Sequence, residues 1–151
     1  MVAQVSAVHK IPMLYFGSGC IFKYDDKHTP ENGVGYTEED IPNFFGSAYS
    51  LAKGKVDTIM RYFPNVLNAR IRFPITESHH HKDFITKIMN YPKILNVRNS
   101  MAVLSDIVPT LIGLLVMSVG GTINATNPGS AEHVEILKLF NHTSYELVPK
   151  E

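Results

Sequence analysis

The sequence has a single cysteine, no net charge and no long hydrophobic run, and each of these restricts what the chain can do. Because Cys20 stands alone, no disulfide can form within the chain, which predicts a reducing, cytoplasmic location. Lys+Arg and Asp+Glu each number 14, so charge gives no reason to expect nucleic acid or an anionic membrane as a partner.

The longest apolar stretch, IVPTLIGLLVMSVGG at residues 107–121, is shorter than the roughly 20 residues that a membrane span needs. Asp106 flanks it and Pro109 lies near its start, which predicts a buried helix instead. The N-terminal residues MVAQVSAVHKIP do not have a basic start followed by a continuous apolar run. We therefore expect neither a signal peptide nor a membrane partner.

Strands and helices alternate along the chain. The apolar patterns predict strands at residues 13–22, 65–73, 93–97 and 122–127, and helices at 48–61, 83–90, 103–118 and after Ser130. This alternation predicts an α/β fold with a mainly parallel sheet, and 151 residues suit one domain, residues 1–151. The polar segment 23–47 is predicted to be a long loop of the kind that usually has a function.

The same patterns predict which residues begin the helices and which are buried. Asp83 and Ser130 are the expected N-caps of the second and the last helix. In the first helix the expected buried face contains Leu51, Val56, Ile59 and Met60, and in the last helix Ile136, Leu137 and Leu139.

One tyrosine and one lysine stand at a helical spacing that chemistry can use. Tyr49 and Lys53 are four residues apart, so they lie on one face of the predicted helix, and an ammonium group beside a phenol makes it a better acid. Ser18 follows the first strand, at the sheet edge where parallel α/β folds bind ligands. Together they could hold a carbonyl oxygen and protonate it, although Tyr-x-x-x-Lys alone is also common on solvated helices.

Several short motifs around this pair occur in a recognisable order. They are GSGCIF at 17–22, EEDIPNFFGSAYS at 38–50, RIRFPI at 70–75, FITKI at 84–88, NSM at 99–101 and TNPG at 126–129. This string, over roughly residues 5–140, resembles the nucleotide-rhamnose synthases of the extended short-chain dehydrogenase/reductase superfamily. The resemblance implies a partial Rossmann-like, doubly wound sheet and an epimerase/reductase acting on a UDP- or dTDP-linked 4-keto-6-deoxy sugar with NADP or NAD.

The resemblance also implies a role for each matching residue of the reductase site. Ser18 would take the position of a substrate-binding hydroxyl, where the family usually has threonine. Tyr49 would be the general acid of keto reduction, and Lys53 would support it and hold the nicotinamide ribose. Pro74, at the end of the second predicted strand, is placed with Tyr49 and Lys53 on the cofactor side.

Two further positions match the family's acid and base for epimerisation. They are Cys20 and Lys87, a thiol and an amine that could move protons on carbons beside a keto group. Without the resemblance, Cys20 would be interpreted as a small buried hydrophobe and Lys87 as an exposed helix lysine.

The sequence departs from the family in one large respect, because it contains no G-x-G-x-x-G motif. Gly17-Ser18-Gly19 begins like one, but Phe22 occupies the position of the third glycine. We therefore expect a truncated form that lacks the N-terminal, glycine-rich half and has little or no activity alone. Such a chain would expose a sheet edge, through which it could form a homo-oligomer or bind a separate cofactor-binding chain. The alternative is a non-catalytic remnant serving as a binding or assembly module.

The run SHHHKD at residues 78–83 could suggest a metal site. Three consecutive histidines cannot all face one ion comfortably, and no cysteine or carboxylate cluster joins them at ligand spacing. A solvated loop is the favoured interpretation, so no metal is expected.

Overall fold

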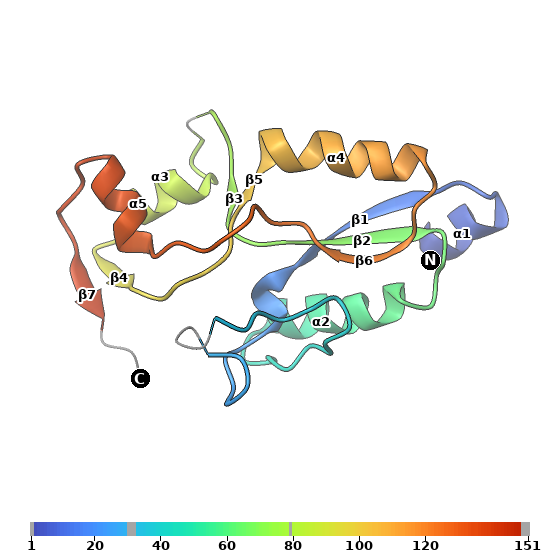
Figure 1. Ribbon diagram of the computed structural model, residues 1–151, viewed down its shortest axis with the longest axis horizontal. Helices are drawn as coiled ribbons and strands as arrows, with labels where there is room; N and C mark the ends of the chain where they lie inside the picture. Colours follow the sequence, from blue (N-terminus) through green and yellow to red (C-terminus); the bar gives the residue numbers. More distant parts are fainter. Residues whose placement is uncertain (1, 30–32, 79, 149–151) are drawn as a thin grey trace.

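The main sheet has three parallel strands, as Figure 1 shows for the computed structural model, which describes residues 2–29, 33–78 and 80–148. The strands are β1 (Met13–Ser18), β2 (Val66–Ile71) and β6 (Gly121–Asn124), in the order β1-β2-β6. Met13 lies opposite Val66, and Leu67 lies opposite Gly121. The central strand β2 is therefore the one bonded on both sides.

Helices cover both faces of this sheet. Helix α4 (Leu104–Val116) packs on one face, while α1 (Val2–Val8) and α2 (Ala48–Met60) pack on the other (Figure 1). Alternate residues of β2 supply both cores, because Leu67 and Ala69 face α4 whereas Val66 packs with Met60. The prediction of an α/β fold with a parallel, doubly wound sheet is thereby confirmed.

A smaller group of elements lies beyond the carboxyl ends of the main strands. It contains α3 (Phe84–Met89), β4 (Lys93–Leu95), α5 (His133–Leu139) and β7 (Glu146–Val148), and β4 pairs with β7 in parallel. Its core is formed by Phe84, Ile88, Ile94, Ile136 and Leu137. Two short parallel strands, β3 (Pro74–Ile75) and β5 (Ala102–Val103), lie between this group and the main sheet (Figure 1).

The predicted strands were too long. The first ends at Ser18, because the Ser18 hydroxyl accepts the Cys20 main-chain N–H and starts a short 3-10 helix, Gly19–Ile21. The second ends at Ile71, so Pro74 does not close it but begins β3. The segment predicted at 93–97 is a strand only over Lys93–Leu95, and it pairs outside the main sheet.

The buried face of α2 differs from the prediction. Leu51 is 45% exposed and Ile59 is 41% exposed, whereas Asp57 is buried. The difference arises because Asp57 turns inward to bind Arg70, which is itself buried in β2. A face that must reach a buried guanidinium does not follow the apolar periodicity of the helix.

The helix caps were predicted with mixed success. Asp83 does cap α3, since its Oδ2 accepts the Thr86 N–H at 3.2 Å. Ser130 does not cap α5; Glu132 does, in a reciprocal capping box with Glu135. Leu139 was expected on the buried side of α5 but is 80% exposed, because the helix ends there.

Two further observations complete the fold. Helix α1 was not predicted, and its single buried residue is Ala3. None of the helices within the described ranges is long and apolar enough to cross a membrane.

Candidate functional site

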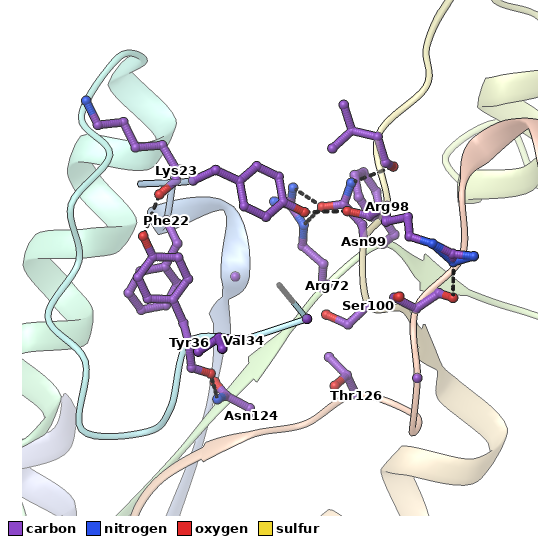
Figure 2. Close-up of a pocket in the computed structure, with 18 of the residues that line it drawn as sticks. Phe22, Lys23, Val34, Tyr36, Arg72, Arg98, Asn99, Ser100, Asn124 and Thr126 are labelled. Carbon is purple, nitrogen blue, oxygen red and sulfur yellow. Dashed lines mark hydrogen bonds between the residues drawn. The ribbon is translucent and has the colours of Figure 1, made fainter. Parts of the chain in front are cut away.

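A cleft of about 740 Å³ opens at the carboxyl ends of the main strands. One wall comes from the loop after β1, and the facing wall comes from residues 95–100 and the start of α5 (Figure 2). Residues that follow β2 and β6 form the floor between them. The cleft therefore lies between the main sheet and the smaller group of elements.

The lining of this cleft is cationic and aromatic. Its cations and rings are Lys23, Arg70, Arg72, Arg98, Phe22, Tyr24, Tyr36 and Phe73. None of the described residues that line it is an aspartate or a glutamate. Charge complementarity therefore favours an anionic ligand, and a volume of several hundred Å³ suits one of nucleotide size.

Arg70 is a structural cation beneath the cleft. Its guanidinium is 1% exposed and binds both oxygens of Asp57, with Nε–Oδ1 at 2.8 Å and Nη2–Oδ2 at 2.7 Å. Asn68 donates a further hydrogen bond to Asp57 Oδ1 at 2.7 Å. The positive charge of Arg70 is thus neutralised inside the protein.

Two arginines hold the loop wall by its main chain. Arg70 Nη1 donates to the Thr37 carbonyl at 3.1 Å, and its Nη2 donates to the Asp40 carbonyl at 3.2 Å. Arg61 Nη2 donates to the carbonyls of Glu38 and Asp40 at 2.8 and 2.9 Å. The segment 37–40 is therefore fixed to α2 and β2, and we call this set of contacts the arginine clamp.

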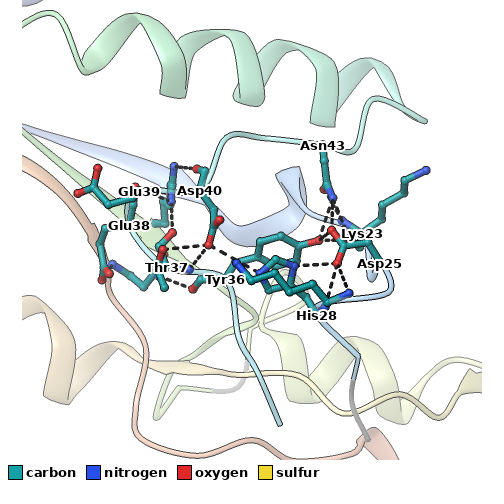
Figure 3. A network of polar contacts seen from close by, with 12 residues as sticks. Lys23, Asp25, His28, Tyr36, Thr37, Glu38, Glu39, Asp40 and Asn43 are labelled. Atoms are coloured by element: carbon teal, nitrogen blue, oxygen red, sulfur yellow. Dashed lines mark hydrogen bonds and ion pairs between the residues drawn. The ribbon is translucent and has the colours of Figure 1, made fainter. Parts of the chain in front are cut away.

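The same loop contains a compact polar network around Tyr36 (Figure 3). Tyr36 Oη lies 2.9 Å from Asp25 Oδ2 and accepts a hydrogen bond from Asn43 Nδ2 at 2.8 Å. The main-chain N–H of His28 donates to the Asp25 carboxylate and lowers the pKa of Asp25 to about 2. Burial, and then this carboxylate, raise the pKa of Tyr36 above its usual value. The loop after β1 is thus ordered by its own polar side chains.

Aromatic stacking continues this wall. The Tyr36 ring lies between those of Phe22 and His28, with centroids 4.3 and 3.9 Å away. The Tyr24 hydroxyl donates to the Arg98 carbonyl, so the loop wall and the facing wall touch across the mouth of the cleft (Figure 2).

His133 lies at the start of α5 and lines the cleft. Burial of its ring, reinforced by the positive charge of Arg72, lowers the pKa of His133 below its usual 6.5. As the pH falls, His133 is protonated in the unfolded chain before it is protonated in the folded one. The contribution of the neutral, buried imidazole to the free energy of unfolding is therefore complete above pH 6.5 and is lost as the pH falls below that value.

We expect urea-unfolding curves measured between pH 8 and pH 5 to show this loss. A His133→Gln variant should lose less stability over that range than the wild type, and His9→Gln, which removes an exposed imidazole, is the control. Equal pH dependence of the wild type and His133→Gln would contradict the expectation.

Ser18 and Cys20, two of the predicted site residues, lie at the end of β1. Ser18 is buried, and its hydroxyl accepts the Cys20 N–H at 3.1 Å. Cys20 is half-buried, and its Sγ lies 2.7 Å from Arg72 Nη1. Only Gly19, which stands between them, is part of the cleft lining.

Tyr49 and Lys53 lie on α2 as predicted, at its first and second turns. Tyr49 is 55% exposed. Lys53 Nζ donates to the Phe16 carbonyl at 3.0 Å and to Tyr15 Oη at 3.2 Å, so the lysine is tied to β1. The structure thus places the pair beside the edge strand β1 and outside the lining of the cleft.

Lys87 and Pro74 lie elsewhere. Lys87 is exposed in the last turn of α3, and Pro74 is exposed in β3; neither lines the cleft. Of the consecutive histidines, His79 lies outside the described residues, while His80 and His81 are exposed. Within the described ranges, no group of three or more His, Cys, Asp or Glu side chains could hold a metal ion.

The sequence interpretation missed the arginines of the cleft as site residues. Arg70 and Arg72 stand two apart at the end of a buried strand, where arginine is rare unless it has a partner. That spacing within RIRFPI was the available signal. Asn99 lies in the NSM motif but was not singled out as a site residue, and no local pattern indicated Arg98 or His133.

Comparison with known proteins places this geometry in context. No protein-family model matches the chain. The sequence is 42% identical over 140 residues to a trifunctional UDP-glucose 4,6-dehydratase/UDP-4-keto-6-deoxy-D-glucose 3,5-epimerase/UDP-4-keto-L-rhamnose-reductase of Arabidopsis thaliana. The structure matches a crystal structure of a UDP-rhamnose synthase from Acanthamoeba polyphaga mimivirus, with a TM-score of 0.89 and 40% sequence identity. The chain is homologous to the nucleotide-rhamnose synthases.

The matches cover most of this chain but only part of each relative. The Arabidopsis match spans 92% of this chain and 21% of that protein, and the viral match spans 97% of this chain and 53% of that one. A dTDP-4-dehydrorhamnose reductase from Bacillus anthracis, solved with NADP, shares the fold with a TM-score of 0.75 at 17% identity. The expected resemblance to this family is confirmed.

Proposed function

We propose that the cleft binds a nucleotide-linked 4-keto-6-deoxy sugar and that this chain supplies the substrate-side residues of an epimerase/reductase of rhamnose biosynthesis. The observation that carries the proposal is a cleft at the carboxyl ends of a parallel sheet whose lining has no described acid and contains two cations, Lys23 and Arg72, that pair with no carboxylate of the described residues. The named activities of the homologues, UDP-rhamnose synthesis and its component steps, support the choice of substrate.

In this proposal the chain's own residues handle protons at the sugar, which must extend beyond the described cleft because none of these residues lines it. Tyr49 donates to the 4-keto oxygen, Ser18 holds that oxygen, and Lys53 orients Tyr49 from its anchor on β1. Cys20 and Lys87 exchange protons at the carbons beside the keto group, which needs no hydride donor.

NADP or NAD would supply the hydride for reduction. Tyr49 and Lys53 suit the nicotinamide ribose, and Pro74 is proposed beside them. The sequence, however, lacks the glycine-rich turn that seats a dinucleotide pyrophosphate. The residues present therefore do not fit the whole cofactor, and we assign no reaction step to it.

The test combines binding with proton exchange. We expect UDP to bind the chain in calorimetry, and UDP-4-keto-6-deoxyglucose in D₂O to gain deuterium beside its keto group without any cofactor. Tyr49→Phe should slow this exchange on the order of 100-fold, because the phenol no longer gives a proton to the keto oxygen as the neighbouring C–H bond breaks, and it should leave UDP affinity unchanged. The dTDP-linked sugar, assayed in parallel, measures the preference for the base.

Tyr62→Phe is the matched control, since it removes an exposed phenol just beyond the same helix. Absence of UDP binding would refute the proposed substrate class. Binding of UDP without measurable exchange in any variant would instead favour the second candidate, a non-catalytic binding or assembly module. The open edge of β1, paired only with β2 among the described strands, is the observation that favours this candidate.

A further inference from the structure

Two of the four cations of the cleft are paired with carboxylates of the protein, one inside it and one at its surface. Asp57 binds Arg70, and Glu135 Oε1 lies 2.9 Å from Arg98 Nη2. Lys23 stands on the exposed loop wall. Arg72 differs from these cations, because it is half-buried and ion-pairs with no carboxylate of the described residues.

Arg72 is nevertheless held firmly, by a neutral group. Asn99 Oδ1 accepts from Arg72 Nη2 at 2.8 Å and from Nε at 3.2 Å. One amide oxygen accepts both N–H groups, where an aspartate would use its two oxygens, and the neutral amide leaves the positive charge in place. Asn99 is itself oriented, because its Nδ2 donates to the Val97 carbonyl at 3.1 Å and its main chain pairs with Ala131.

The remaining surroundings of Arg72 leave part of the guanidinium available to a ligand. The Phe73 ring lies 4.4 Å from Arg72 Cζ, and Cys20 Sγ lies 2.7 Å from Nη1. A guanidinium has five N–H groups, and three point at Asn99 and Cys20, which leaves two for the cleft that Arg72 lines (Figure 2).

The field of this charge reaches its neighbours. The lowered pKa of His133 has the charge of Arg72 as its second cause, after burial. A half-buried cation without a counterion is costly to keep, so an anion that enters the cleft would gain from meeting it.

We propose that Arg72, held by Asn99, is the anion anchor of the cleft and binds the diphosphate of the nucleotide sugar. This inference rests on the proposed function and adds the contact that fixes the ligand. It is consistent with the position of Cys20, which is proposed to act on a carbon beside the keto group, such as C5. Only the ring oxygen, the anomeric carbon and the glycosidic oxygen separate C5 of the sugar from the β-phosphorus. One guanidinium can therefore touch both the thiol and the phosphate.

The experiment compares UDP with uridine, which lacks the diphosphate, in NMR titrations of the full chain at one low salt concentration. We expect Arg72→Gln to weaken UDP binding about 10- to 100-fold, the range for charge-assisted hydrogen bonds, and to leave uridine binding unchanged. Asn99→Asp should weaken UDP binding similarly, because a carboxylate of the same size neutralises Arg72. Lys23→Gln, which removes a cation from the exposed wall, should cost less than about 3-fold.

Two outcomes overturn the inference, and they are distinguishable. If the wild type binds UDP and both Arg72→Gln and Asn99→Asp bind it equally well, Arg72 is not the anchor and the proposed function stands. If the wild type fails to bind UDP, the proposed function fails as well. Asn99→Asp keeps the arginine in place, so the comparison remains possible even if Arg72→Gln does not fold.

Discussion

Replacing Asp57 with alanine is expected to lower the free energy of unfolding by about 3–5 kcal/mol, because it leaves the buried Arg70 charge without a counterion. Both side chains are 1% exposed, and the two groups share a bidentate contact at 2.7 and 2.8 Å. Asn68 would lose the shorter of its two hydrogen bonds at the same time. Urea unfolding followed by circular dichroism measures the loss.

Matched variants separate this buried pair from surface charge. Glu146→Gln breaks the exposed contact with Lys93 at 3.5 Å and should change stability by less than about 1 kcal/mol. The double variant Asp57→Leu/Arg70→Met removes both charges and should be more stable than Asp57→Ala alone. A loss for Asp57→Ala no larger than that for Glu146→Gln would show that Arg70 is not a desolvated charge.

Replacing Gly120 with alanine is expected to cost about 3 kcal/mol, the upper end of the range for overpacking. A Cβ at this position would lie 1.9 Å from the Pro64 carbonyl oxygen and 3.5 Å from that of Val66. The contact with Val66 is an ordinary van der Waals distance, so the obstacle is the main chain of Pro64 just before β2, and no side chain can move aside to relieve it. Urea unfolding again measures the effect.

Gly113→Ala is the control for this substitution. Gly113 lies inside α4, and a Cβ there would meet no atom within 4 Å. The change should stabilise the protein by about 0.5–1 kcal/mol, because glycine is unfavourable inside a helix. Equal stability of the Gly120→Ala and Gly113→Ala variants would contradict this expectation. It would show that the close approach of Pro64 does not require a glycine at position 120.

The longer helices were predicted well from the sequence. The helices at 48–61, 83–90 and 103–118 appear close to their expected positions, and Asp83 caps α3 as predicted. The two-residue strands β3 and β5 were missed because their pairing joins segments far apart in sequence. Helix α1 buries only Ala3, so it has little apolar face to detect.

The candidate site was less predictable than the fold. Tyr49, Lys53, Ser18 and Cys20 were chosen from spacing and resemblance, and their catalytic roles stay predictions. The cleft is defined instead by Arg72 and by residues from three separate loops. Asp57 illustrates the difficulty. It turns inward from α2 to bind Arg70, 13 residues away in sequence, and so interrupts the apolar spacing from which a helix face is predicted.

The arginine clamp determines which wall of the cleft can move. Releasing residues 37–40 would deprive the buried Arg70 of its carbonyl acceptors, so that wall is a rigid part of the sheet domain. The facing wall meets the sheet domain through side chains instead, which include Arg72 with Asn99, Tyr24 with Arg98, and the rings of Phe73 and His133, 5.1 Å apart. Any widening of the cleft would therefore have to come from the smaller group of elements, because moving the loop wall would remove the acceptors of the buried Arg70.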